Sequence, residues 1–177
     1  MELKVGQKAP EFKLPDQDDK THTLTEYKGK WLLIYFYPKD NTSGCTKEAC
    51  MIRDSFPSFG KLDAQVVGIS GDSVKSHKKF AEEYKLPFTL LADENKKVMQ
   101  KYDVWQKKKL YGRQKSSSPS RIPKGAPRGR QETIPSYMGT VRTSFLVDPT
   151  GKIAKIYKNV KPELHADEVL HDLELLK

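Results

Sequence analysis

Cys45 has the surroundings of a reactive thiol. It ends a polar segment, residues 38–44, that follows an apolar and aromatic run, and helix-forming residues continue from it up to Pro57. The sequence therefore predicts Cys45 in the first turn of a helix that begins just after a buried strand. A thiol reacts as its thiolate, and the unpaired N–H groups and the dipole of a helix start favour that negative charge.

Residues just before Cys45 are suited to binding a small polar substrate. Pro38 fixes the chain where it leaves the strand and has no N–H group that could compete for a hydrogen bond. Thr42 offers a hydroxyl that can accept from and donate to a bound substrate. Gly44 lets the backbone approach closely, because it has no side chain in the way. We therefore expect this segment to position a substrate beside the thiolate.

Cys50 is the only other cysteine and follows Cys45 by five residues. A permanent disulfide is disfavoured in a reducing compartment, so the two cysteines are redox-active, metal-binding or incidental. A metal site needs further ligands at suitable spacing, and the four histidines lie far from the cysteines in sequence. We therefore expect no metal and no other cofactor. The redox-active and the incidental interpretation of Cys50 both stay open.

Strand and helix patterns alternate on both sides of this segment. Residues 31–37 are apolar or aromatic throughout, which is typical of a central strand buried on both faces. Further strands are predicted at 64–70, 88–91, 141–147 and 152–157, and helices at 46–54, 72–84, 95–102 and 162–176. In the last helix the expected core stripe is Val169, Leu170, Leu173 and Leu176.

Turn sequences indicate how these strands are connected. Residues 148–151 are a turn sequence that joins the last two strands in a hairpin, and the extended pieces 11–14 and 21–24 predict a small N-terminal hairpin. The order of elements indicates an α/β fold with a mixed central sheet and helices on both faces. This pattern suits a thioredoxin-like fold.

Residues 113–136 interrupt the pattern. Serine, proline and glycine dominate their composition, and six basic residues against one acid give the segment +5 of the chain's net charge of +9. Such a composition cannot repay the entropy of ordering, so we expect a single domain, 1–177, with a flexible basic insertion at 113–136. The segment could bind phosphates but lacks interleaved aromatic residues, so nucleic-acid binding is expected only through this loop, if at all. A natural and an engineered origin both stay open.

The sequence also suggests a location. The longest apolar run, residues 31–37, is far shorter than the roughly 20 residues that cross a membrane. The N-terminus lacks the apolar core of a secretory signal. We therefore expect a cytoplasmic protein with no membrane partner.

The segment around Cys45 resembles a known family. Pro38-x-x-x-Thr42-x-x-Cys45 looks like the peroxiredoxin signature, and the continuation to Cys50 is similar to the subgroup called bacterioferritin comigratory protein or peroxiredoxin Q. The resemblance extends over residues 1–112 and 137–177 and includes the motifs at 6–12, 102–105, 137–139 and 142–148. Ser43 departs from it, because this subgroup usually has proline there. The effect of Ser43 on turnover is left open.

The resemblance implies a thiol peroxidase that reduces hydrogen peroxide and organic hydroperoxides. It makes Cys45 the peroxidatic cysteine that becomes a sulfenic acid, Thr42 the hydroxyl that positions the peroxide, and Pro38 the shielding proline. It makes Arg142 the group that stabilises the thiolate and the departing oxygen. Cys50 becomes the resolving cysteine, whose disulfide with Cys45 is reduced by thioredoxin or a similar dithiol. The resemblance also implies a monomer.

The spacing of the cysteines predicts a conformational change. On an unbroken helix, residues five apart rise about 7.5 Å, which exceeds the ~7 Å between Cα atoms that a disulfide tolerates. A disulfide between Cys45 and Cys50 therefore requires the helix near residues 45–53 to unwind. We expect an intact helix in the reduced form and a rearranged one in the oxidised form.

Other interpretations of the same residues are structural. Cys45 and Cys50 could be buried packing residues, and Arg142 could pair with a surface carboxylate. Glu48 could contact Arg142, but an exposed glutamate on a helix is the favoured interpretation, and the histidines need no function. A thioredoxin-type oxidoreductase usually has a C-x-x-C pair, which this chain lacks. A basic binding module driven by residues 113–136 is the third function class.

Overall fold

The computed structural model describes residues 1–109 and 136–177. Residues 113–135 of the predicted insertion lie outside the described residues, so its flexibility and its nucleic-acid binding stay predictions. Ser136, which that prediction also included, begins a strand. None of the helices in the two described ranges is long and apolar enough to span a membrane.

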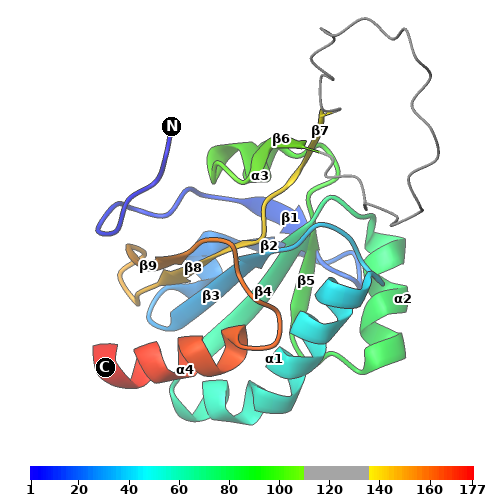
Figure 1. Ribbon diagram of the computed structural model, residues 1–177. Coiled ribbons are helices and arrows are strands. Elements are labelled where there is room, and N and C mark those ends of the chain that lie inside the picture. Colours follow the sequence, from blue (N-terminus) through cyan, green and yellow to red (C-terminus); the bar gives the residue numbers. More distant parts are fainter. Residues whose placement is uncertain (110–135) are drawn as a thin grey trace, which may run out of the picture.

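A mixed five-stranded sheet forms the centre of the molecule, in the order β5-β4-β3-β8-β9 (Figure 1). The strands are β3 (Trp31–Phe36), β4 (Ala64–Ser70), β5 (Thr89–Ala92), β8 (Thr143–Val147) and β9 (Ile153–Tyr157). β3 runs parallel to β4, and β4 parallel to β5, whereas β8 is antiparallel to both β3 and β9. The predicted strands, the hairpin of the last two and the mixed sheet are therefore confirmed.

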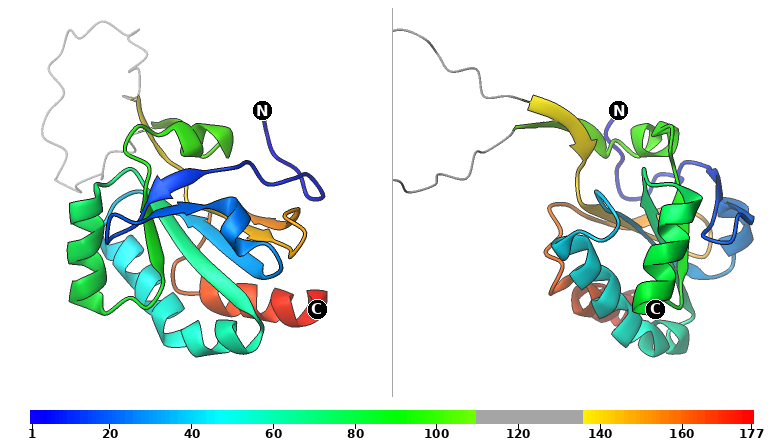
Figure 2. Two further views of the ribbon diagram at one scale, coloured as in Figure 1. Left: turned by 180° about the vertical axis from the view of Figure 1, so that it is seen from behind. Right: turned by 90° about the vertical axis from the view of Figure 1, so that its right-hand side faces the viewer.

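Helices cover one face of this sheet, and smaller elements cover the other (Figure 2). The helices of the first face are α1 (Ser43–Lys61), α2 (Val74–Tyr84) and α4 (His165–Leu176). The second face packs against the N-terminal hairpin of β1 (Lys13–Pro15) and β2 (Thr21–Thr23), against η1 (Leu24–Tyr27) and against α3 (Lys97–Lys101). The N-terminal hairpin and the helices on both faces agree with the sequence prediction.

β3 is buried on both faces because its side chains alternate between the two cores. Leu33 and Tyr35 belong to the core under α1, α2 and α4, whereas Leu32, Ile34 and Phe36 belong to the core of the other face. Burial of both faces explains the continuous apolar run at residues 31–37. Because β3 is the central strand, the loop to α1 begins at the end of the middle strand of the sheet.

α1 is longer than predicted. Its expected end lay before Pro57, but the helix continues through this proline to Lys61. Proline in a helix interior costs about 3 kcal/mol, because it removes one hydrogen bond and clashes with the preceding turn. Phe59 is fully buried two residues later. Burial of a phenylalanine side chain contributes roughly 1.5–3 kcal/mol, which offsets much of that cost.

Two smaller predictions are also corrected. α4 begins at His165, three residues after Pro162, and Leu176 of its expected core stripe is 47% exposed, whereas Val169 and Leu173 are buried. The sequence analysis also missed an antiparallel ribbon of β6 (Trp105–Lys109) and β7 (Ser136–Thr140). Most side chains of these strands are exposed, so no apolar alternation marks them.

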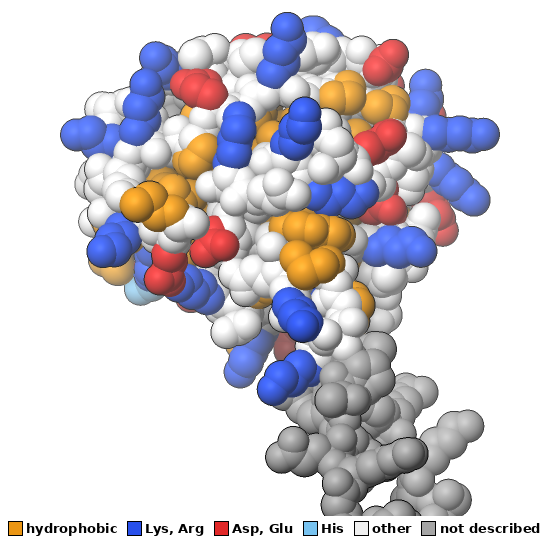
Figure 3. Space-filling view, turned by 90° about the horizontal axis from the view of Figure 1, so that it is seen from above, with side chains coloured by type: hydrophobic (Ala, Val, Ile, Leu, Met, Phe, Trp, Pro, Cys, Tyr) orange, Lys and Arg blue, Asp and Glu red, His pale blue; other side chains and the backbone are white. Residues whose placement is uncertain are grey.

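Basic residues are spread over the surface seen from above the sheet. Lysine and arginine side chains lie apart from one another there, with acidic and hydrophobic side chains between them (Figure 3). A nucleic-acid site is marked by clustered basic residues on one face. This face of the described residues carries no such cluster.

Candidate active site

Cys45 lies in the first turn of α1, at the place where the chain has just left β3. Thr42 is the N-cap residue, and its carbonyl accepts the first helical hydrogen bond from the Thr46 N–H at 2.8 Å. The Cys45 side chain is 1% exposed and its thiol is free. The predicted position at a helix start is therefore confirmed.

The Thr42 hydroxyl does not cap this helix. A capping threonine usually accepts from the N–H of the second or third helical residue, but the Thr42 hydroxyl instead donates to the Lys39 carbonyl at 2.9 Å. Two consequences follow. The N–H groups of the first turn are left to a negative charge near Cys45, and the Thr42 oxygen keeps its lone pairs for a donor from a substrate.

Arg142 contacts Cys45 although 97 residues separate them in sequence. The register of β3 and β8 pairs Phe36 with Thr143, so Arg142 lies beside the end of β3. Its carbonyl accepts from the Val160 N–H at 3.2 Å, and its Nη2 donates to the Cys45 Sγ at 3.3 Å. A guanidinium at this distance stabilises a thiolate over a thiol.

Gly44 leaves room for this guanidinium. A Cβ atom at position 44 would lie 3.1 Å from Arg142 Nη2 and 3.8 Å from Pro162 Cγ. The first of these distances is tighter than ordinary van der Waals contact. In the structure, the group that approaches the Gly44 backbone is therefore the arginine that also contacts the sulfur.

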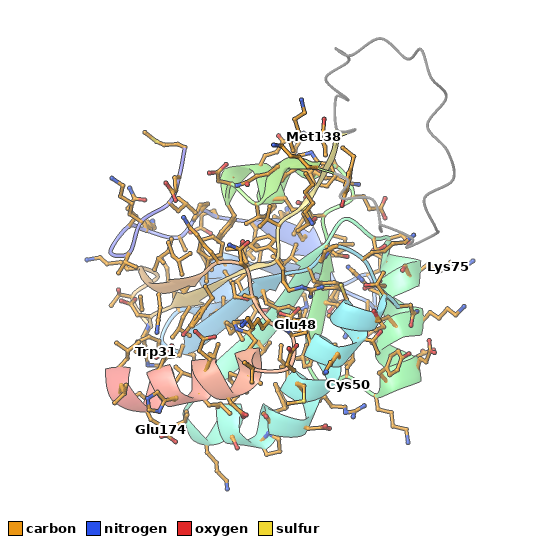
Figure 4. The ribbon with its side chains drawn as sticks, in the orientation of Figure 1. Trp31, Glu48, Cys50, Lys75, Met138 and Glu174 are labelled. Carbon is orange, nitrogen blue, oxygen red and sulfur yellow. The ribbon has the colours of Figure 1, made fainter. Side chains whose placement is uncertain are left out.

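Glu48 is the second partner of Arg142. Its carboxylate accepts from Arg142 Nη1, and its side chain is fully buried, so the expectation of an exposed glutamate is wrong. Figure 4 shows Glu48 on α1 towards the centre of the molecule. Burial raises the pKa of Glu48 to about 7, against the opposing charge and hydrogen bond of Arg142. The carboxyl group thus holds the guanidinium beside the Cys45 sulfur.

Two further residues near this site were missed by the sequence analysis. His165, the first residue of α4, is buried and its Nε2 lies 2.8 Å from the Ser144 hydroxyl. Burial, and then the charge of Arg142, lower its pKa to about 4. Burial, and then the charges of Glu48 and Cys45, raise the pKa of Tyr35 far above its ordinary value. In the sequence, Tyr35 was indistinguishable from packing residues of its strand.

Three buried side-chain atoms in the two described ranges have no hydrogen-bond partner. They are Tyr35 Oη, Glu48 Oε1 and His165 Nδ1. Each belongs to a residue whose pKa responds to the charge of Arg142. Unpaired buried polar atoms are costly and cluster where a protein needs a particular electrostatic environment. Their grouping marks the surroundings of Arg142 as a functional rather than a packing region.

The β6–β7 ribbon approaches the same region. The Val141 N–H donates to the Val104 carbonyl at 2.8 Å, which joins the end of β7 to the start of β6 beside Arg142. Burial, and then the charge of Arg142, lower the pKa of Lys108 on β6. No sequence pattern linked these strands to the cysteine.

The other predicted site residues occupy different environments. Pro38 is exposed at the start of the loop, and Thr42 is exposed at its end. Cys50 is half-buried and free, on the same continuous helix as Cys45 (Figure 4). The structure therefore brings Arg142 and Cys45 into contact and leaves the two cysteines as separate thiols on an intact helix.

Comparisons with known proteins agree with this geometry. The AhpC/TSA family model matches residues 5–156. The chain is 40% identical over 174 residues to peroxiredoxin Bcp of Bacillus subtilis, which covers 98% of this chain and 97% of that protein. The chain belongs to the AhpC/TSA family.

Relatives from plants and solved structures narrow the place within the family. Chloroplastic peroxiredoxin Q of Populus jackii is 42% identical over 172 residues, covering 97% of this chain and 68% of that protein. A cysteine-to-serine variant of PrxQ from Xylella fastidiosa has a TM-score of 0.82 at 29% identity, with 99% and 98% of the two chains covered. A Xanthomonas campestris bacterioferritin comigratory protein with alkyl peroxide reduction activity has a TM-score of 0.77 at 32% identity, with 93% and 91% covered.

These relatives give the chain a thioredoxin-like peroxiredoxin fold and place it with Bcp and PrxQ proteins. A peroxiredoxin is a thiol peroxidase, which takes a peroxide substrate and a thiol reductant. The resemblance deduced from the sequence motifs is therefore confirmed.

Proposed function

We propose that the chain reduces hydrogen peroxide and organic hydroperoxides through Cys45. The Cys45 thiolate attacks one oxygen of the peroxide, an S–O bond forms, and the O–O bond breaks. The sulfur is oxidised to a sulfenic acid, and the other oxygen leaves with a proton as water or an alcohol. The observation that carries this proposal is the Arg142 Nη2 contact with the Cys45 Sγ at 3.3 Å at the start of a helix.

Each part of the site has a role in this step. The hydroxyl proton of Thr42 is engaged by the Lys39 carbonyl, so its oxygen accepts a hydrogen bond from the peroxide O–H. Arg142 and the first N–H groups of α1 stabilise the thiolate and then the charge on the departing oxygen. Gly44 leaves the space in which the guanidinium and the substrate meet. Pro38, at the start of the loop, is the shielding proline.

We propose further that Cys50 resolves the sulfenic acid. Its sulfur attacks the Cys45 sulfur, a disulfide forms, and the oxygen leaves as water. Both cysteines lie on α1, which is continuous from Ser43 to Lys61 in the thiol form. The disulfide requires part of this helix to unwind, because residues five apart on a helix lie beyond disulfide reach. A thioredoxin-like dithiol then reduces the disulfide.

A peroxide-consumption assay coupled to a thioredoxin system tests this function. Cys45→Ser is expected to abolish turnover, because hydroxyl oxygen does not replace the thiolate. Cys50→Ser is expected to stop after sulfenic acid formation, with at most slow rescue by external thiols. Full activity of Cys45→Ser would contradict the proposal. Full thioredoxin-dependent activity of Cys50→Ser would contradict only the resolving role.

The finer assignments of partner and place stay predictions. We expect thioredoxin or a similar dithiol as reductant, a single domain and a monomer, which sedimentation of the reduced protein can test. We expect a cytoplasmic location, although the plant relatives are chloroplastic proteins. Fractionation of cells that produce the protein natively tests the location.

A further inference from the structure

The loop between β3 and α1 is held by polar side chains that the peroxiredoxin motif does not specify. Of its residues 37–42, Tyr37 and Asp40 are buried, and the other four are exposed. The loop carries Thr42 at its end, so whatever fixes the loop also fixes the Thr42 hydroxyl. Asp40 is the only buried carboxyl group in the loop.

The Asp40 carboxylate accepts three hydrogen bonds. Tyr37 donates its hydroxyl to Oδ1 at 2.6 Å, and Ser76 donates its hydroxyl to Oδ2 at 2.8 Å. His77 Nδ1 lies 2.7 Å from the same Oδ2, and the two side chains are 0% and 2% exposed. Ser76 and His77 belong to the first turn of α2. A single carboxylate therefore joins the loop before Cys45 to a different helix.

The two ring nitrogens of His77 each face an acceptor. Nε2 lies 3.0 Å from the Leu91 carbonyl, which can only accept, so Nε2 carries a hydrogen. Nδ1 faces Oδ2 of Asp40, so the ring is held between the loop and β5. Removal of one partner of such a pair leaves an uncompensated buried group.

The peptide group between Lys39 and Asp40 carries the connection to Thr42. Its N–H donates to Asp72 Oδ2 at 2.8 Å, and its carbonyl accepts from the Thr42 hydroxyl at 2.9 Å. Asp72 Oδ2 is itself fixed by the Ser70 hydroxyl at 2.6 Å, at the end of β4. A chain of hydrogen bonds thus runs from β4 through Asp72 and one peptide plane to the Thr42 hydroxyl. Hydrogen bonds in such chains polarise and strengthen one another.

We propose that Asp40, Asp72 and His77 are positioning residues that orient the Thr42 hydroxyl for peroxide. The proposal rests on the proposed function of Cys45. Ligand atoms of the three residues lie close enough together to suggest a metal site. Their atoms, however, are already engaged by donors and acceptors of the protein, from Tyr37, Ser70, Ser76 and Leu91. Hydrogen bonding within the protein therefore accounts for the cluster. The hydrogen bonds from Asp72 continue through the Lys39–Asp40 peptide group to the Thr42 hydroxyl.

Two reactions of Cys45 separate positioning from a general effect on the thiol. Peroxide oxidation needs the Thr42 oxygen, whereas alkylation by iodoacetamide needs only an accessible thiolate. Both rates are measured by single-turnover kinetics in a Cys50→Ser background, at a temperature where each variant is folded. Asp72→Ala removes the acceptor of the Asp40 N–H. We expect peroxide oxidation to fall about tenfold and alkylation to change less than about twofold, because small misplacements affect only an oriented reaction.

Conservative and matched variants complete the test. Asp72→Asn keeps an acceptor oxygen and is expected to restore most of the oxidation rate. His77→Gln is expected to slow oxidation, and its combination with Asp72→Ala to lose about as much as Asp72→Ala alone, because the residues act as one unit. Asp16→Ala is the matched control, since Asp16 is a buried carboxylate that binds His22 at 2.7 Å and backbone N–H groups in the N-terminal hairpin. It is expected to change neither rate.

The outcomes distinguish the two proposals. Unchanged oxidation in Asp72→Ala, an equal fall of oxidation and alkylation, or the same loss in Asp72→Asn overturns the positioning role. An additive loss in the double variant contradicts the claim that Asp72 and His77 act as one unit. Failure of the wild-type Cys45 to react with peroxide instead contradicts the proposed function.

Discussion

At the scale of single residues, Arg142 serves two partners at once. One guanidinium nitrogen contacts the Cys45 sulfur, and the other contacts the Glu48 carboxylate. The planar guanidinium can do both because its N–H groups point in fixed, different directions. Because Glu48 is buried, ions from the solvent do not compete with Arg142 for its carboxylate.

The two-sided contact predicts that lysine cannot replace Arg142. A lysine is a point charge at the end of a flexible chain and does not bind a sulfur and a carboxylate in fixed geometry. We expect Arg142→Lys to slow single-turnover oxidation of Cys45 by about a hundredfold, the size typical for loss of one oriented donor. Stopped-flow oxidation of the folded variant measures this. A rate within twofold of the wild type would show that charge alone suffices.

His165 predicts how stability depends on pH. Burial lowers its pKa from 6.5 to about 4, so the native state favours the neutral ring. Its contribution to stability is present above about pH 6.5 and is lost as the pH falls towards about 4. Over this range the wild type should lose about 3 kcal/mol relative to His165→Gln. Urea unfolding at several pH values measures the difference, and parallel curves for the two proteins would contradict it.

Glu48 changes stability in the opposite direction over much of that range. Its pKa is raised from 4.5 to about 7, so its contribution is present below about pH 4.5 and is lost as the pH rises to about 7. The total pH dependence therefore underestimates the effect of His165. The comparison with His165→Gln isolates it, provided that Glu48 is present in both proteins.

At the scale of elements, α1 carries both the reactive cysteine and a proline in its interior. Pro57 cannot donate the hydrogen bond that the Arg53 carbonyl would otherwise accept in the helix. The Arg53 side chain is tied elsewhere, through Nη1 to the Tyr84 carbonyl at 2.8 Å. The part of α1 around the cysteines is therefore less firmly joined to its C-terminal turn than in an uninterrupted helix.

This weakness predicts the effect of Pro57→Ala. Alanine restores the helical hydrogen bond, so we expect the reduced protein to gain about 1–3 kcal/mol of stability. Closing the Cys45–Cys50 disulfide requires unwinding of the helix. The activation free energy of disulfide formation should therefore rise by a similar amount, and the disulfide should form more slowly. Urea unfolding and quenched-flow trapping of the disulfide measure the two effects. Greater stability without slower disulfide formation would show that the unwinding does not extend to this part of α1.

At the scale of the whole molecule, the predicted insertion joins two strand ends that are already paired with each other. β6 and β7 pair Lys109 with Ser136, so the two ends that flank residues 110–135 lie side by side. A two-residue hairpin turn can join such paired ends. The site residues all lie within the described ranges.

Replacement of residues 110–135 by an Asn-Gly turn is therefore expected to preserve peroxide oxidation within about twofold, because two-residue turns fit paired antiparallel strands. Single-turnover kinetics measure the rate. Retention on a polyanion column is expected to fall, because residues 113–136 contribute +5 of the net charge of +9. A large loss of oxidation would instead give this segment a part in the site.

The sequence by itself determined the local features. The apolar run of β3, the polar loop and the helix formers after it placed Cys45 at a helix start, because these patterns depend on neighbouring residues. The cysteine spacing likewise follows from helix geometry. The motif around Cys45 was sufficient to identify the family.

Only the tertiary structure decided which distant groups surround the sulfur. The antiparallel register of β3 and β8 brings Arg142 to Cys45, and packing between α1 and the core turns Glu48 inward. Burial of Phe59 carries α1 through Pro57, against its local propensity. The polar chain from Ser70 through Asp72 to Thr42 joins β4 to the loop before Cys45. These contacts depend on strand register and burial, which arise when distant segments pack and leave no local pattern in the sequence.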